Sequence, residues 1–119
     1  MYKRHLTGKE GEDFVEKYLV KNNYIIIAKN FRCYFGEIDV IAKDQEKNEI
    51  VFMEVKTRNN ITYGTPAESV TVRKRKNICN VAKYFIHIYQ LEKEFIRFDV
   101  IEVYIDDEKY DINHIKQAF

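Results

Sequence analysis

Two apolar segments, residues 38–42 and 50–57, flank a short polar loop in this chain, and each carries charged residues among its apolar ones. The β-branched residues of both segments are typical of strands, and residues 44–49 between them are all polar. This pattern predicts a β-hairpin. The nearly continuous apolar run over residues 50–53 suits a central strand that is covered on both faces.

The rest of the chain alternates helical and strand patterns, in the order α-β-β-β-α-β. Apolar residues recur at helical spacing in two segments, while β-branched and aromatic residues are concentrated in the others. Start signals for the second helix occur twice, at Pro66 and at Thr71. We therefore expect helices over residues 8–22, with a capping box at Thr7, and from Pro66 or Thr71 to residue 89, and strands over residues 24–31, 38–42, 50–57 and 95–104.

These elements predict the fold class. The first three strands can form an antiparallel meander, and the second helix can cross over to place the fourth strand parallel to the third. The closing residues Ile112, Ile115 and Phe119 would dock on the core. We expect one α/β (α+β) domain over residues 1–119, with a mixed four- to five-stranded sheet flanked by helices.

The composition narrows the class of protein. Hydrophobic residues make up 45% of the 119 positions and charged residues 33%, which is typical of a globular chain. No apolar run approaches the ~20 residues of a membrane helix, and no apolar stretch follows the basic N-terminus as in a secretory signal. Cys33 and Cys79 lack metal-ligand spacing. We interpret them as reduced thiols in a cytoplasmic protein, although ordinary semi-buried cysteines would look the same.

The register of the predicted hairpin brings two carboxylates together. A symmetric turn centred on residues 46–47 opposes residues whose numbers sum to 93, so Asp39 faces Glu54 and Glu37 faces Lys56. Opposed carboxylates destabilise a sheet. Either one of them is protonated, with a raised pKa, or a divalent cation such as Mg²⁺ bridges them.

Three further features can contribute to such a site. Lys56 shares a strand face with Glu54, and it could orient a metal-bound water or stabilise negative charge on a phosphate. Glu12 lies on the rim of the first helix and could add a third carboxylate. The alternatives are an inter-strand ion-pair network for Asp39, Glu54 and Lys56, and a solvated helix position for Glu12.

A run of four basic residues, 73–76, falls in the first turn of the second helix. Cations oppose the helix dipole there, and a bound phosphate backbone would explain their position. The alternative is an ordinary solvated helix face. Tyrosine and phenylalanine occupy apolar periodic positions, so we interpret the aromatic segments as core rather than as a base-stacking platform.

Taken together, these residues resemble the YraN-like family of uncharacterised bacterial proteins. The resemblance spans about residues 8–103, and its motifs are highly specific as a set. The matching segments are residues 8–12 (GKEGE), 30–32 (NFR), 36–41 (GEIDVI), 52–58 (FMEVKTR), 63–66 (YGTP) with Glu68, Lys74, and 97–100 (RFDV).

The resemblance implies a restriction-endonuclease-like fold with a PD-(D/E)xK nuclease site. Asp39 matches the first acid of that motif, and Glu54 and Lys56 match its (D/E)xK part. Glu12 matches a first-helix glutamate that archaeal Holliday-junction resolvases of this fold also use, and Lys74 matches a recurrent basic position. Ile38 stands where the motif has proline, a residue that metal binding does not require.

We therefore expect a metal-dependent endonuclease that hydrolyses phosphodiester bonds in DNA, with branched or damaged DNA as a candidate substrate. Two alternatives are a nucleic-acid-binding module of the same fold that no longer cuts, and a structural interaction protein. We expect a homodimer that spans two strands or a junction. The expected metal ligands, for one or two Mg²⁺ or Mn²⁺ ions, are Asp39, Glu54 and Glu12, and the expected phosphate contacts are Arg58, Arg73, Lys74 and Lys76.

Overall fold

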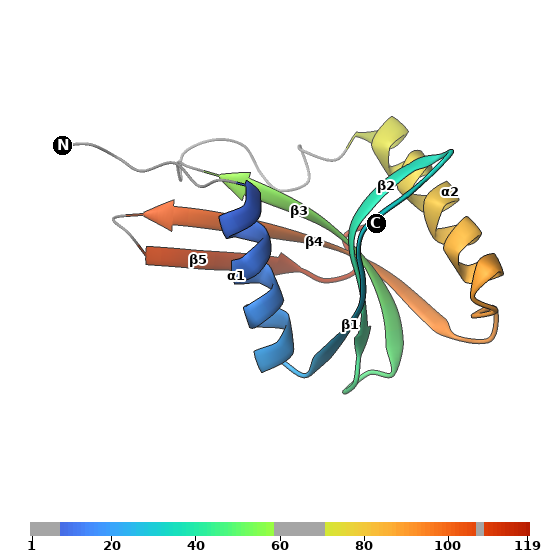
Figure 1. Cartoon of the computed structure of the whole chain (residues 1–119), viewed down its shortest axis with the longest axis horizontal. Coiled ribbons are helices and arrows are strands. Elements are labelled where there is room, and N and C mark those ends of the chain that lie inside the picture. Colours follow the sequence, from blue (N-terminus) through green and yellow to red (C-terminus); the bar gives the residue numbers. More distant parts are fainter. Residues whose placement is uncertain (1–7, 59–70, 107–108) are drawn as a thin grey trace.

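The computed structural model describes residues 8–58, 71–106 and 109–119. Its elements confirm the α+β class and the predicted order, with one additional strand at the end (Figure 1). The capping boxes expected at residues 7–10 and 65–68 involve residues outside the described ranges. The elements are α1 (Gly8–Lys21), β1 (Tyr24–Cys33), β2 (Gly36–Asp44), β3 (Glu49–Arg58), α2 (Val72–Ile88), β4 (Phe95–Asp106) and β5 (Lys109–Ile115).

The five strands form one mixed sheet, in the order β1-β2-β3-β4-β5. As predicted, β1, β2 and β3 form an antiparallel meander, and β4 runs parallel to β3 after α2 crosses over. The segment expected only to dock on the core is the fifth strand, antiparallel to β4. Its period of two was visible in the sequence, since partly buried Tyr110, Ile112 and His114 alternate with exposed polar residues.

The central strand β3 divides the core into two halves, as its apolar run predicted. Val51 and Met53 pack on the side of α1, in a cluster with buried residues of that helix. Ile50 and Phe52 pack on the other side, against α2. The two helices therefore cover opposite faces of the sheet, and residues that follow Phe52 at a spacing of two face α2.

The β1–β2 hairpin departs from simple alternation. Its register shifts between Ile26 and Ala28, and Asn30 adopts a left-handed φ of 52°. Both Ile38 and Ile41 consequently pack in the cluster on the α2 side, while Val40 packs on the α1 side. A regular strand, as expected from the sequence pattern, would place residues 38, 40 and 42 on one face, but the distortion in β1 interrupts the alternation of the paired strand at Asp39.

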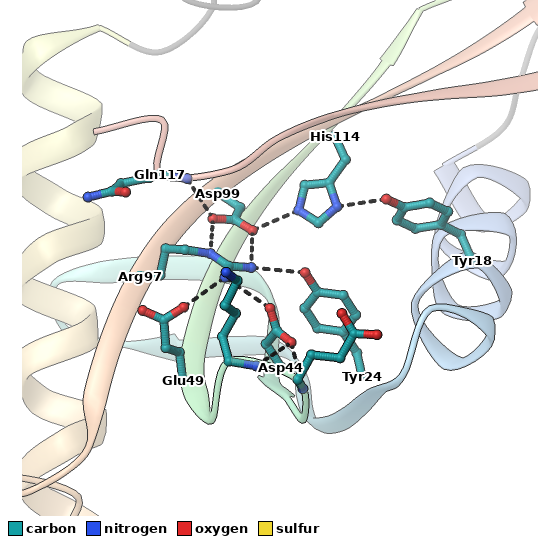
Figure 2. A network of polar contacts seen from close by, with 10 residues as sticks. Tyr18, Tyr24, Asp44, Glu49, Arg97, Asp99, His114 and Gln117 are labelled. Atoms are coloured by element: carbon teal, nitrogen blue, oxygen red, sulfur yellow. Dashed lines mark hydrogen bonds and ion pairs between the residues drawn. The ribbon is translucent and has the colours of Figure 1, made fainter.

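A buried arginine joins four strands near the end of the sheet where β3 begins (Figure 2). Arg97 of β4 is only 6% exposed, and its guanidinium donates hydrogen bonds of 2.9–3.0 Å to four side chains. The carboxylate of Asp99 accepts two of them in bidentate geometry, and Asp44, Glu49 and the Tyr24 hydroxyl accept the others. Such pairing is required for a charge that is removed from water.

The same network continues from Asp99 to β5 and α1. His114 Nε2 lies 2.7 Å from Asp99 Oδ2, and its Nδ1 lies 2.8 Å from the Tyr18 hydroxyl on α1. Burial acts to raise the pKa of Asp99, but hydrogen bonds from His114, Arg97 and the Gln117 backbone NH outweigh it and hold that pKa below its ordinary value. The lowered pKa favours the ionised form of Asp99, and the network through Arg97 and His114 links all five strands of the sheet and α1.

In the described part of the chain, neither helix is both long and apolar enough to cross a membrane. Cys33 and Cys79 are both free thiols, as expected. The cytoplasmic location that we inferred from them stays a prediction.

We predict that Arg97→Met lowers the free energy of unfolding by at least about 3 kcal/mol, because it leaves buried carboxylates without their cation. Urea denaturation at pH 7 would measure this loss. Lys29→Met is the matched control, since the Lys29–Glu16 pair is exposed and should contribute less than about 1 kcal/mol.

Equal losses in the two variants would show that the buried network does not carry the stability assigned to it. If Arg97→Met does not fold, Arg97→Lys provides a second measurement. This substitution keeps the positive charge but removes the planar guanidinium group. Its loss of unfolding free energy should therefore still exceed that of the control.

Candidate functional site

The side chains of Glu54 and Lys56 project from β3 toward α2, on the face that also carries Phe52. The first turn of α2 brings Lys74 to the same place, and Thr71 caps that turn by accepting a 3.1 Å hydrogen bond from the Lys74 NH. Lys74 Nζ lies 2.6 Å from Glu54 Oε1, and Lys56 Nζ lies 3.7 Å from the same oxygen. One nearly buried carboxylate oxygen, on a residue 7% exposed, therefore interacts with two ammonium groups.

Asp39 of β2 completes this cluster from the neighbouring strand. Its Oδ2 accepts a 2.8 Å hydrogen bond from the backbone NH of Val55. Burial raises the pKa of Asp39 to about 6, with Glu54 and Glu37 acting in the same direction against the Val55 hydrogen bond and Lys74. The predicted conflict between two carboxylates is thus present, and it takes the form of a raised pKa.

The two lysines differ in their electrostatic environment. Burial lowers the pKa of Lys56, and the adjacent Lys74 ammonium lowers it further. Burial acts in the same direction on Lys74, but the short ion pair with Glu54 outweighs it and raises the pKa of Lys74. Lys56, with its lowered pKa, is therefore the better candidate for proton transfer. Lys74, with its raised pKa, keeps its positive charge more strongly.

The register agrees with the predicted sum of 93 from Val40–Met53 to Asp44–Glu49. The strand pairing does not extend to Asp39, which bonds to the β3 backbone instead of standing in a regular pair. Glu37 does not approach Lys56 in the expected way, since it pairs with Arg32 of β1 at 2.7 Å. The distortion of the β1–β2 hairpin accounts for both differences.

The structure does not bring Glu12 into the cluster. Glu12 is exposed on α1, which covers the face of the sheet opposite Glu54, and its charge acts on Lys29 of β1. Among residues 8–58, 71–106 and 109–119, no three His, Cys, Asp or Glu side chains group closely enough to hold a metal ion. The role of Glu12 as a third ligand stays a prediction.

Sequence reasoning missed a second buried glutamate on the same face. Glu102 of β4 stands beside Lys56 in the register and is almost fully buried. It accepts hydrogen bonds from Tyr104 and Asn113, and Arg58 Nε lies 3.5 Å from its carboxylate. The sequence did contain a signal for Glu102, because it is an acidic residue between apolar neighbours, as Asp39 is.

The predicted phosphate contacts divide into two groups. Arg73 and Lys76 are exposed on α2, so they are accessible to an anion. Lys74 and Arg58 have carboxylate partners, and a phosphate would have to compete with these. Arg75 of the same basic run lies over the ring of Phe119, 5.7 Å from its centroid.

Asp39 and Glu54 are suitable donors for a hard divalent cation. Mg²⁺ is held through oxygen ligands, usually one or two carboxylates together with water and substrate phosphate, and Mn²⁺ prefers the same donors. Two adjacent carboxylates, one with a raised pKa, fit this requirement. A cation at Glu54 would compete with the ammonium of Lys74.

The fold and this cluster define an α+β protein that carries an acid–lysine site between its central strands and its second helix. The sequence profile of the uncharacterised protein family UPF0102 matches residues 11–103. A UPF0102 protein of Clostridium perfringens is 50% identical over 115 residues, which cover 94% of this chain and 92% of the relative. A UPF0102 protein of Caldicellulosiruptor saccharolyticus is 46% identical over the full length of both chains. This chain therefore belongs to the UPF0102 family, in agreement with the resemblance found in its sequence.

We predict that Asp39→Asn raises the free energy of unfolding at pH 8 by about 1–2 kcal/mol, because the wild type must keep a desolvated carboxyl group ionised. A raised pKa favours the folded state below the ordinary value of 3.8, and this advantage is lost as the pH rises through about 6. The gain from Asn should therefore disappear near pH 4.

Urea denaturation across pH 4–8 would test this prediction, with Glu37→Gln as the control on the same strand. Glu37 pairs with an exposed arginine, so its substitution should change stability by less than about 1 kcal/mol. A gain for Asp39→Asn that does not vary with pH would contradict the assigned titration.

Proposed function

We propose that this protein is a metal-dependent nuclease that hydrolyses phosphodiester bonds in DNA. The observation that carries the proposal is the cluster itself, in which nearly buried Glu54 interacts with two lysines beside the high-pKa carboxyl group of Asp39. Ordinary ion pairs lie on a solvated surface, whereas burial is one of the ways in which the pKa values of catalytic groups are shifted. The order of helices and strands is also what the resemblance to restriction-endonuclease-like proteins implies.

Each residue has a role in this proposal. Asp39 and Glu54 hold Mg²⁺ or Mn²⁺, which when bound supplies Lewis-acid stabilisation and an activated water. Lys56 lies on the same face and assists the attacking water by orienting it or helping to deprotonate it. Exposed Arg73 and Lys76 bind the flanking phosphates.

A binding module that does not cut is the second candidate. The 2.6 Å ion pair between Lys74 and Glu54 favours it, because an ammonium at this distance neutralises the carboxylate without any metal. A purely structural cluster is the third candidate and rests on the same ion pair. The preference for branched or damaged DNA and the homodimer stay predictions.

We predict that calorimetric titration with Mn²⁺ detects binding to the wild type and that Asp39→Ala weakens it at least tenfold. Lys74→Ala should bind Mn²⁺ more tightly than the wild type, because the competing ammonium is gone. Glu16→Ala, which removes a carboxylate of α1 outside the cluster, should bind as the wild type does. Identical affinities for wild type and Asp39→Ala would exclude the site, and absence of binding at millimolar Mn²⁺ would leave only the two candidates that need no metal.

We predict Mn²⁺-dependent cleavage of branched, nicked or single-stranded DNA, with a loss of about 100-fold or more in Asp39→Ala and in Lys56→Ala. Gel assays of labelled substrates would measure it, and Lys17→Ala on the exposed part of α1 is the control for loss of a lysine. DNA binding without cleavage would favour the second candidate. Cleavage that persists in both site variants would indicate a contaminating nuclease and would refute the mechanism.

A further inference from the structure

Three aromatic side chains are exposed where the tip of the β1–β2 hairpin meets α2. Tyr34 is 97% exposed, Phe35 44% and Tyr84 41%. The ring centroids of Tyr34 and Phe35 lie 5.6 Å apart and those of Phe35 and Tyr84 6.3 Å apart, with edge-to-face geometry in both pairs. We refer to these three residues as the aromatic tip. They depart from the prediction that the aromatic segments belong to the core.

The aromatic tip is anchored to the folded core. Phe31 of β1 contacts Tyr84 on one side and buried Phe85 on the other, with centroids 6.4 and 5.0 Å apart. Gly36 follows the tip with a φ of 142°, and a β-carbon there would lie 3.6 Å from the side chain of Val81 on α2. The hairpin therefore lies along α2, as Figure 1 shows, and it holds the exposed rings in place.

One stripe of α2 connects the aromatic tip with the candidate site. Lys74, Asn77, Val81 and Tyr84 follow one another at spacings of three and four residues, so they lie along the same side of the helix. Lys74 contacts Glu54 at one end, and Tyr84 contacts Phe35 at the other. The ten residue steps from Lys74 to Tyr84 span roughly 15 Å, or about four nucleotides at the 3.4 Å rise of a stacked strand.

Within this stripe Val81 is buried against the hairpin, so a ligand would follow the exposed side of α2 beside it, and the charge of the helix indicates which ligand that is. The helix carries five basic residues, Arg73, Lys74, Arg75, Lys76 and Lys83, and no acidic residue, in a chain whose formal net charge is only +1. A surface that combines exposed aromatic rings with the exposed cations Arg73, Lys76 and Lys83 matches the two parts of a nucleic-acid strand, its bases and its phosphates. A neutral apolar partner would leave the cations unpaired.

We propose that the aromatic tip stacks unpaired bases of a nucleic-acid strand whose backbone follows α2 toward Asp39 and Glu54. This inference rests on the proposed function, because the site gives the strand its direction. It also narrows the substrate. Bases inside a duplex are already stacked and paired, so exposed rings engage a strand with a single-stranded segment, such as an overhang, a flap or a frayed end.

Binding without metal tests the proposal separately from cleavage. Fluorescence anisotropy in EDTA would compare a labelled single-stranded thymidine 20-mer with a 20-bp duplex. The double variant Tyr34→Ala/Phe35→Ala should lose roughly tenfold or more in affinity for the single strand and much less for the duplex. Phe95→Ala is the matched control, because Phe95 is also exposed but lies at the opposite end of the strands, and it should bind as the wild type does.

A tryptophan at the tip provides a second measurement. The chain contains no tryptophan, so Tyr34→Trp introduces a single emitter at a fully exposed position. Stacking on a base should quench its fluorescence when the 20-mer is added, and Phe95→Trp should show no comparable change. Unchanged emission at saturating 20-mer would overturn the proposal.

The outcomes distinguish failure of the stacking from failure of the nuclease. Loss of cleavage in Asp39→Ala together with normal binding by the tip variant would retain the nuclease and refute the stacking. Conversely, selective loss of single-strand binding by the tip variant supports the stacking even if no substrate is cut. If analytical ultracentrifugation finds a dimer that Tyr34→Ala converts to monomer, the tip is a contact between two copies and the proposal is wrong.

Discussion

Arg97 places a guanidinium group in the interior of this protein. Two of the carboxylates that neutralise this group come from other strands, so the need to pair it constrains the position of most other elements. Arg97 can be satisfied only when Asp44, Glu49 and Asp99 converge on it, which aligns β2, β3 and β4 at one end of the sheet. His114 extends the same requirement to β5. A buried ion pair is weak evidence for stability, but it penalises every register that leaves a charge unpaired. We interpret the network as a device that specifies strand alignment.

Strand alignment in turn places the candidate site. β3 begins at Glu49 beside Arg97 and reaches Glu54 five residues later, so its register with β2 and β4 decides which groups Glu54 meets. The break in alternation near Asn30 turns Asp39 toward the β3 backbone, where its carboxyl group is desolvated next to Glu54. Two carboxylates and two lysines are thereby held together in a partly dry environment. An additional charged species, a cation or an anion, would therefore change the interactions among these four groups.

Local patterns in the sequence were sufficient for most elements, for the register of the β2–β3 hairpin and for the proximity of Asp39, Glu54 and Lys56. They were insufficient where the outcome depends on distant residues. The partners of Arg97 come from four separate strands, and no local periodicity reports a positive φ at Asn30. Glu12 was predicted from its position on the helix rim and from the resemblance, and its helix packs on the other face of the sheet. Exposure of Tyr34 follows from a turn whose tip lies beyond the core, although its composition resembles that of a buried strand.

Because α2 contains no acidic residue, positive and negative charge are divided unevenly between this helix and the rest of the chain. If the five cations of this helix are set aside, 15 lysines and arginines remain against 19 acids, so the rest of the chain carries a formal charge of −4. A nearly neutral protein therefore carries an excess of positive charge on one helix. A polyanion would therefore approach with α2 turned toward it. Ionic strength should accordingly act on the fraction of encounters that are correctly oriented, more than on long-range attraction.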